Sequence, residues 1–264
     1  MKNKIIVFYT PGKKYIETVL EKIKEAAKNN NYSVSVYKKE KEELKEFDFG
    51  IAVGGDGTFL WAASIVCKFN LPILGINLGN LGFLTDIKKE EIDKVFLYLK
   101  DKNYYIQERS LLKANFKGKE EIALNDCVFS SKDIRVINLD IFIDDEFVTQ
   151  ISGDGLIIAT PTGSTAYSLS SGGPILKPDV EAFVITPISP HTLTFRPIVV
   201  SWKSRILVKV KRSCNFICDG QRLFNLDEDE EVLIRKNESP LKVVKIKDWK
   251  YFSILREKLN WGNK

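Results

Sequence analysis

The sequence has little histidine and cysteine: one histidine, His191, and four cysteines among 264 residues. The two closest cysteines, Cys214 and Cys218, are spaced neither as a redox Cys-x-x-Cys pair nor as a zinc knuckle. A cage of histidine and cysteine ligands is therefore nearly excluded, so we expect no protein-held metal site and reduced, mostly structural thiols. A Gly-x-Ser-x-Gly elbow is also missing, which favours a loop-bracing role for His191 over a catalytic one.

Long apolar runs and a strong excess of one charge are missing as well. No stretch approaches the roughly 18 consecutive apolar residues that a membrane span requires, and residues 1–10 lack the features of a signal peptide. We therefore expect a cytoplasmic protein without a membrane partner. The net charge of +5 suits small anionic molecules, but no basic stripe interleaved with aromatic residues indicates a nucleic-acid partner.

The first hundred residues alternate between two apolar patterns. Short apolar runs, each typical of a buried strand, are followed by helical spacing, as at Ile16, Val19 and Ile23. Alternating units of this kind are typical of a parallel sheet with helices on its faces. We predict an α/β N-terminal domain with a parallel sheet over 1–102.

The pattern changes from about Tyr104, where apolar residues begin to recur at every second position. The segments 231–236 and 241–247 alternate in this way on either side of a short turn, as antiparallel strands do. We predict a mainly antiparallel β C-terminal domain over 103–248. The tail 249–264 returns to helical spacing, and we expect it to pack back on the first domain.

The stretch Gly-Gly-Asp-Gly-Thr at 54–58 follows a predicted strand and opens a helical pattern. Glycines let a ligand approach the backbone closely, and the free N–H groups at a helix start favour an anion such as phosphate. Thr58 is a candidate N-cap for that helix. Asp56 beside a phosphate suggests a general base that accepts a proton from an attacking hydroxyl. A plain glycine turn with a capping acid remains the alternative for these residues alone.

Two further stretches carry polar and glycine residues. Gly75–Asp86 holds three glycines and two asparagines after a predicted buried strand, as at the carboxyl edge of an open α/β sheet. Ser152–Leu176 holds eight Ser or Thr hydroxyls, five glycines and Tyr167, which suit ribose, phosphate and a stacked base. Ligand-free turns remain the alternative reading for each stretch.

Taken in order, these stretches resemble the NAD kinase family, ATP-dependent enzymes that make NADP. The matching patterns are GGDGT at 54–58, NxGxxGFLT at 77–85 and DGxxxxTPTGSTAYxxSxGGP at 154–174. Ala-Leu-Asn-Asp at 123–126 and Cys-Asp-Gly-Gln at 218–221 continue the match, which runs from about residue 50 to 221. The order of the patterns is specific, whereas GGDGT alone is shared with diacylglycerol and sphingoid-base kinases.

The resemblance implies a two-domain fold with the site between the domains, NAD and ATP as substrates, Mg²⁺ or another divalent cation with ATP, and a homodimer or homotetramer. It implies that Asp56 is the catalytic base for the 2′-hydroxyl of the adenosine ribose of NAD. The positions that it implies for dinucleotide binding are Gly55, Asp56, Gly57, Asn125, Asp126, Ser152, Asp154, Thr162, Thr165, Ala166, Tyr167, Ser168, Leu169, Ser170 and Gln221.

The resemblance also implies roles for groups of these residues. Asn125 and Asp126 would hold ribose hydroxyls, and Asp154 the nicotinamide side of the dinucleotide. Residues 162–170 would shape the adenine and ribose pocket with help from a neighbouring subunit, and Gln221 would reach the new phosphate. The family usually shows Asn-Glu where this chain has Asn125-Asp126, so the acid is one methylene shorter.

Two other functions share some of these features. A diacylglycerol-type lipid kinase would share Asp56 but should lack the hydroxyl-rich stretch at 160–167 and should show an apolar acyl channel. A non-catalytic dinucleotide sensor would keep the pocket but would be expected to lose Asp56. The combination of both features therefore favours phosphoryl transfer to NAD, with the choice between NAD and NADH, and between ATP and polyphosphate, left open.

Overall fold

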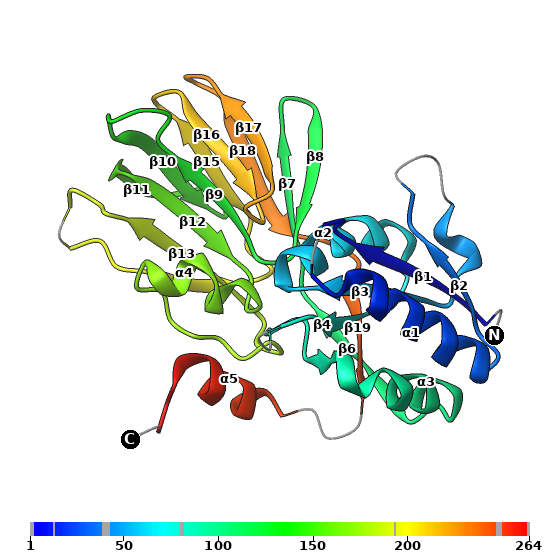
Figure 1. The fold of residues 1–264 in the computed structure, drawn as a ribbon. Helices are drawn as coiled ribbons and strands as arrows, with labels where there is room; N and C mark the ends of the chain where they lie inside the picture. Colours follow the sequence, from blue (N-terminus) through cyan, green and yellow to red (C-terminus); the bar gives the residue numbers. More distant parts are fainter. Residues whose placement is uncertain are drawn as a thin grey trace. The chain divides into compact units, whose positions relative to one another are not determined.

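The computed structural model describes residues 3–12, 14–38, 43–79, 82–192, 194–246 and 250–262. The chain divides into two compact units. The first is built from Met1–Glu108 together with Leu241–Lys264, and the second from Arg109–Pro240. Figure 1 labels their helices and strands. Within the described ranges, none of the helices combines the length and apolar character needed to cross a bilayer.

The first unit contains a sheet with a parallel centre, as predicted. Its strand order is β2-β1-β3-β4-β19-β6, with β5 also beside β4, and β2, β1, β3 and β4 run parallel to one another. Every residue of β3 and β4 is buried, because such a sheet is covered on both faces. The bounds of these strands are β1 Lys4–Tyr9, β2 Ser33–Val36, β3 Phe49–Gly54, β4 Ile73–Asn77, β5 Ile87–Lys88, β6 Tyr104–Arg109 and β19 Leu241–Ile246.

Helices lie on both faces of this sheet. Helices α1 (Ile16–Asn29) and α3 (Ile92–Lys100) share one core cluster with Ile5 and Val7 of β1. Phe8, which points to the opposite face because side chains alternate along a strand, meets Trp61 of α2 (Asp56–Val66) with 5.9 Å between ring centroids. The short 3-10 helices of this unit are η1 Leu44–Glu46, η2 Cys67–Phe69 and η3 Lys89–Glu91, and its last helix is α5 Tyr251–Leu259.

Strand β19 differs from the sequence-based expectation. The alternation at 241–247 suggested a further antiparallel strand of the C-terminal domain, but β19 runs parallel to β4 in the first unit, with Val243 opposite Ile73. Alternating apolar residues report which faces of a strand are covered and carry no information on its partner or direction. The same holds for β6, which begins at Tyr104 and belongs to the first sheet. In the sequence, the boundaries between the two units therefore fall between Glu108 and Arg109 and between Pro240 and Leu241. Residues 247–249, 263 and 264 lie outside the described part.

The second unit consists of two antiparallel sheets, which confirms its predicted class. Their orders are β11-β10-β15-β18-β7-β8 and β14-β13-β12-β9-β16-β17. One core cluster takes Phe129, Phe183 and Phe216 from the second sheet and Leu139, Val208 and Ile234 from the first, as in a β-sandwich. The bounds are β7 Leu112–Phe116, β8 Lys119–Ala123, β9 Asp126–Ser130, β10 Ile137–Ile143, β11 Glu146–Gly153, β12 Gly155–Ala159, η4 Gly163–Thr165, α4 Tyr167–Ser170, β13 Ala182–Ile188, β14 Ile198–Ser201, β15 Ile206–Val210, β16 Cys214–Cys218, β17 Arg222–Leu226 and β18 Glu231–Lys236.

Candidate active site

Asp56 is the first residue of α2, directly after the buried strand β3. Gly55 takes the N-cap position of this helix, so Thr58 lies inside the first turn and the prediction that Thr58 is the N-cap was wrong. The helix starts earlier than expected because Gly55 supplies the extended backbone of the cap and its carbonyl accepts the first N–H groups, from Thr58 at 3.0 Å and Phe59 at 3.2 Å. Asp56 consequently lies at the amino end of a helix, where the backbone carries partial positive charge.

The carboxylate of Asp56 accepts four hydrogen bonds from the segment that precedes β5. Its Oδ2 accepts from the N–H of Phe83 at 2.9 Å. Its Oδ1 accepts from the N–H groups of Leu84 and Thr85, each at 3.1 Å, and from Thr85 Oγ1 at 3.0 Å. Each carboxylate oxygen offers about two lone-pair sites, so three donors crowd Oδ1 while Oδ2 keeps one acceptor site. The side chain is thereby held in one orientation.

Two glycines allow this segment to pass so close to Asp56. A Cβ on Gly82 would lie 2.0 Å from Asp56 Oδ1, and a Cβ on Gly75 would lie 2.7 Å from the carbonyl oxygen of Leu84. Asn77, the last residue of β4, donates through Nδ2 to Thr85 Oγ1 at 3.0 Å and to the Thr85 carbonyl at 3.3 Å. The stretches at 54–58 and 75–86 therefore form one structure at the carboxyl ends of β3 and β4. Residues 80 and 81 of the second stretch lie outside the described residues.

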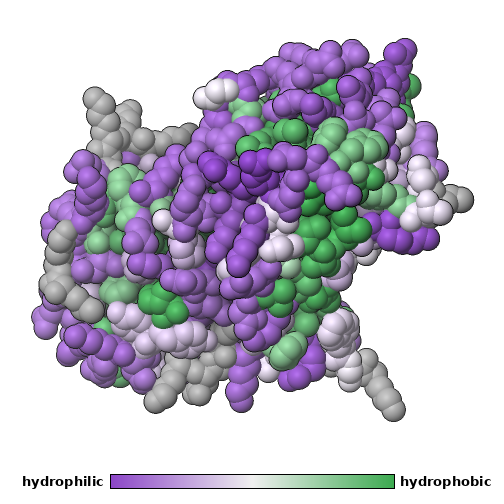
Figure 2. All heavy atoms as spheres, turned by 180° about the vertical axis from the view of Figure 1, so that it is seen from behind, coloured by the Kyte–Doolittle hydropathy of each residue, from purple (hydrophilic) through white to green (hydrophobic). Residues whose placement is uncertain are grey.

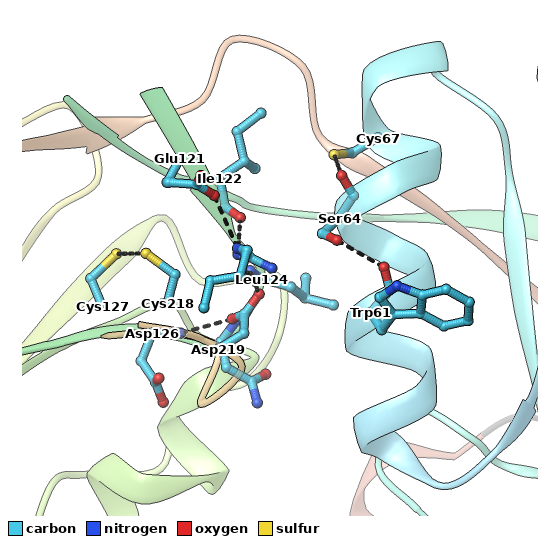
Figure 3. A network of polar contacts seen from close by, with 12 residues as sticks. Trp61, Ser64, Cys67, Glu121, Ile122, Leu124, Asp126, Cys127, Cys218 and Asp219 are labelled. Atoms are coloured by element: carbon cyan, nitrogen blue, oxygen red, sulfur yellow. Dashed lines mark hydrogen bonds and ion pairs between the residues drawn. The ribbon is translucent and has the colours of Figure 1, made fainter. Parts of the chain in front are cut away.

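In the second unit a carboxylate organises the turn that leads into β9. Asp219 accepts N–H groups from Leu124 at 3.0 Å, Asn125 at 2.7 Å and Asp126 at 3.3 Å. Figure 3 shows this network, with Asp219 reaching the turn from the end of β16. Asp219 adopts φ of 53° in the connection between β16 and β17. Sequence reasoning gave it no role, because its partners lie more than ninety residues away.

The hydroxyl-rich stretch packs against the same turn. Thr160 Oγ1 donates to the Leu124 carbonyl at 2.6 Å, and a Cβ on Gly163 would lie 2.0 Å from the Asn125 carbonyl oxygen. Arg109, only 3% exposed, donates to Thr162 Oγ1 at 3.3 Å. Thr160 and Thr162 are thus used within the protein, and they fix the path of the chain around Asn125.

A cavity of about 250 Å³ opens beside this turn. Four predicted binding residues line it, namely Asn125, Asp126, Ala166 and Tyr167, together with Val128, Ile217, Asp219 and Gly220. The Tyr167 side chain is 48% exposed. The cavity therefore offers a mostly apolar wall with an aromatic face, and carboxyl groups from Asp126 and Asp219.

Asp126 is the most unusual group in this cavity. It is 4% exposed, yet its carboxyl group makes no hydrogen bond or ion pair with any residue in the described part of the chain. Burial, and to a lesser extent the charge of Asp219, raise the pKa of Asp126 from 3.8 to about 7. Burial also raises the pKa of Asp219, although three backbone N–H groups and Arg222 act in the opposite direction.

Both units match known family models. The model described as ATP-NAD kinase N-terminal domain matches residues 2–104, and the one described as ATP-NAD kinase C-terminal domain matches residues 124–246. The chain belongs to the ATP-NAD kinase family.

Curated relatives and solved structures of this family agree over most of the chain. An NAD kinase of Hydrogenovibrio crunogenus is 42% identical over 231 residues, covering 84% of this chain and 79% of the relative. An NAD kinase of Aquifex aeolicus is 37% identical, covering 98% of this chain and all of the relative. Yeast NADH kinase complexed with NADH superposes with a TM-score of 0.89 at 27% identity, covering 99% and 88% of the two chains. An NAD kinase from Archaeoglobus fulgidus in complex with ATP gives 0.82 at 31% identity, covering 97% and 98%.

As a member of the NAD kinase family, the chain is a transferase with the family's two-domain fold. The remaining residues implied by the family resemblance are more dispersed. Asp154 is exposed between β11 and β12, and Gln221 is exposed after the β16–β17 turn. Ser168, in α4, is fully buried and its Oγ lies 2.9 Å from Thr186 Oγ1. None of these three lines the cavity beside Asp126, and their assignment to dinucleotide binding stays a prediction. The other implied positions, Gly55, Gly57, Ser152, Thr165, Leu169 and Ser170, lie in the Asp56 turn, in β11, in η4 and in α4.

The cysteine and histidine residues do not line the cavity beside Asp126. The described residues include no group of three or more His, Cys, Asp or Glu side chains placed to hold a metal ion. His191 is exposed, and its backbone N–H donates to the Ser152 carbonyl at 2.9 Å. Cys127 and Cys218 are buried thiols with 3.9 Å between their sulfur atoms.

Proposed function

We propose that this chain transfers the γ-phosphoryl group of ATP to the 2′-hydroxyl of the adenosine ribose of NAD, with Asp56 as the general base. The observation that supports this assignment is the placement of a single oriented carboxylate at the amino end of α2, flanked by Gly55 and Gly57. Family membership supports the reaction, and the geometry supports the choice of base.

The transfer is an in-line displacement. The ribose oxygen forms a bond to the γ-phosphorus, the bond from that phosphorus to the bridging oxygen of ADP breaks, and the hydroxyl proton goes to Asp56. Such reactions depend mainly on positioning and on neutralising charge. A divalent cation that arrives with ATP would supply positive charge, as would the N–H groups at the start of α2.

Asp56 Oδ2 accepts a single hydrogen bond, from the Phe83 N–H, and so keeps an acceptor site for the ribose hydroxyl. Three of the donors are backbone N–H groups of one continuous segment, and the fourth is the hydroxyl of Thr85. All three of the donors on Oδ1 come from Leu84 and Thr85. We therefore infer that the ribose hydroxyl donates to Asp56 Oδ2, while the contacts on Oδ1 hold the carboxylate in its orientation.

The second unit is proposed to hold the dinucleotide. The Asp126 carboxyl group lacks a hydrogen-bond partner among the described residues, and Asp126 lines the same cavity as Asn125 and Tyr167. A buried acceptor of this kind suits the hydroxyl donors of a ribose. Tyr167 is placed to stack on a base, and Asp154 and Gln221 are proposed for the nicotinamide side and the new phosphate.

The decisive experiment is a coupled assay of NADP formation from NAD, ATP and magnesium with the Asp56→Asn variant. Loss of a positioned base lowers turnover by about 10² to 10⁴-fold. The amide NH₂ group introduced at position 56 faces the N–H groups of the segment 83–85, which are also donors. NAD affinity is therefore measured in parallel by calorimetry, which separates a loss of binding from a loss of turnover. Asp93→Asn, on the exposed face of α3, is the matched control. Near-normal turnover of Asp56→Asn would remove the base assignment.

A dinucleotide sensor without turnover, which family membership disfavours, is the alternative that this assay tests. It predicts NAD binding and no NADP formation by the unchanged protein. The lipid-kinase alternative has lost its support, since both units match the NAD kinase family. Running the assay with NAD and with NADH distinguishes the two acceptors.

We also propose a homodimer or homotetramer. Three strands at the edges of the second unit's sheets carry exposed apolar side chains: Phe147 of β11 is 55% exposed, Val199 of β14 50% and Leu223 of β17 62%. Figure 2 shows apolar surface among the polar side chains of one face of the molecule. Exposed edges of this kind are normally covered, here by a second copy of the chain. Light scattering should report a mass of two or four chains, and Leu223→Lys should lower it if β17 contributes.

A further inference from the structure

A buried ion pair joins the last strand of the first unit to the segment that holds Asp56. Lys245 Nζ lies 2.5 Å from Asp86 Oδ2, and the two side chains are 2% and 6% exposed. The partners are 159 residues apart in the chain. Removing two charges from water costs several kcal/mol per ion, so stability alone is a weak reason for such a pair. The position of the pair suggests a different reason, namely a role in holding the segment that binds Asp56.

Asp86 immediately follows the three residues whose N–H groups bind Asp56. Phe83, Leu84 and Thr85 are thus fixed at one end by Asp86 and β5. Within the segment, the Gly82 N–H donates to the Thr85 carbonyl at 3.0 Å, which closes it into a tight turn. A shift of Asp86 would therefore be transmitted directly to the donors of Asp56.

Lys245 holds Asp86 at a point where the edge of β4 changes partner. Strand β19 pairs with the start of β4, with Val243 opposite Ile73. Strand β5 pairs with its end, with Ile87 opposite Ile76. Both registers, continued along the parallel strands, bring Lys245 and Asp86 to the level of Gly75. At Gly75 the segment crosses β4 so closely that a Cβ would lie 2.9 Å from Thr85 Cα.

We propose that Lys245 is a positioning residue for Asp56, acting through Asp86 and the backbone of Phe83–Thr85. This inference rests on the proposed function, because it gives Asp56 the role of base. Lys245 acts through its ion pair with Asp86 and is not itself a catalytic group. Its charge holds Asp86 at the point where the partner of β4 changes from β19 to β5. The N–H groups of Phe83, Leu84 and Thr85 then fix the direction of the Asp56 oxygens.

The test compares Lys245→Met, Lys245→Arg and a charge-free double variant, Asp86→Leu with Lys245→Met. A loosened Asp56 should lower kcat by about 10- to 100-fold, because small misplacements of a catalytic group carry costs of that size. The KM for NAD should stay within about threefold, since most of the proposed dinucleotide contacts lie in the other unit. Lys245→Arg should recover most of kcat. The matched control is Lys113→Met, which breaks the ion pair of another largely buried lysine, with the exposed Glu238 at 2.6 Å in the second unit.

Amide hydrogen exchange supplies a readout that needs no turnover. Exchange at Phe83, Leu84 and Thr85 should rise by at least about tenfold in Lys245→Met and in the double variant, and should be unchanged in Lys113→Met. The double variant removes both charges and folds even if the single variant does not, because apolar replacement of a buried pair is often neutral. Unchanged exchange at these amides together with unchanged kcat in the folded double variant overturns the proposal. If instead Asp56→Asn stays active while exchange at 83–85 rises, the base assignment fails and the positioning of the segment by Lys245 stands.

Discussion

Affinity for NAD should depend on pH through Asp126. This carboxyl group is buried beside Asp219, has no partner among the described residues, and has a pKa raised from 3.8 to about 7. If ribose hydroxyls donate to it, only its ionised form binds them fully. The charged group that acts on its pKa is Asp219, whose Oδ2 lies 3.5 Å from Arg222 Nη2.

The size of the effect follows from the titration of one group. With a pKa of about 7 in the free protein and a pKa well below 6 in the complex, the apparent dissociation constant should fall about tenfold between pH 6 and pH 8. Binding should release close to one proton per NAD at pH 6 and very few at pH 8. Calorimetry in buffers with different ionisation enthalpies measures both quantities.

The stability of the free protein gives an independent check with the opposite trend. The folded-state pKa of Asp126 lies above its unfolded value, so the folded protein holds a proton that the unfolded chain releases between pH 3.8 and about 7. Stability from this group is therefore complete below pH 3.8 and is lost as pH rises toward 7. The difference corresponds to at most about 4 kcal/mol.

Variants separate Asp126 from other titrating groups. Asp126→Asn should bind NAD with little dependence on pH, whereas Asp126→Glu should keep it. His191→Gln should keep it too. A dissociation constant that is flat between pH 6 and 8 in the unchanged protein would refute the reasoning. A constant that rises with pH would mean that protonated Asp126 acts as the donor.

Three further perturbations test single contacts. Gly82→Ala should lower kcat by about 10- to 100-fold, because the new Cβ would lie 2.0 Å from Asp56 Oδ1 and must displace it; normal kinetics would show that the segment adapts. Asp219→Ala should lower the free energy of unfolding by about 3 kcal/mol in urea titration, since three N–H groups of the turn lose their acceptor; a change below about 1 kcal/mol would argue against this bracing role. Among the four cysteines, only Cys67 should react promptly with a thiol reagent in the native protein, because the other three are buried. Burial also raises the pKa of the Cys214 thiol to about 12. Rapid reaction of a second thiol would contradict this prediction.

The fold class followed from apolar spacing, but the partner of each strand did not. Alternation of strands and helices predicted the parallel sheet of the first unit, because both faces of such a sheet must be covered. Strand β19 shows the limit of this reasoning. Its alternating residues are equally compatible with a parallel and an antiparallel partner, so its place beside β4 depends on contacts with residues about 170 positions earlier.

The candidate site was predictable where a local motif carries it. Asp56 and the glycine stretch at 75–86 were both expected after buried strands, and the structure brings them into contact. The engagement of Asp56 by four donors was not predictable, because it depends on how the segment 82–85 folds back. Asp219 was missed for a similar reason: its carboxylate serves a turn that precedes it by more than ninety residues. Short-range sequence patterns do not indicate which residues far apart in the chain will form a hydrogen bond.

The arrangement of β19 between β4 and β6 has a consequence for how the protein is made. The first unit takes its sheet from residues near both ends of the chain, whereas the second unit is one continuous insertion, Arg109–Pro240. A ribosome delivers the insertion complete before it delivers β19, so during synthesis the neighbouring edges of β4 and β6 stay open. The unit whose first strands precede the insertion is therefore the last to close. A fragment ending at Glu108 would retain both exposed edges, and a nascent chain passes through that same state each time the protein is synthesised.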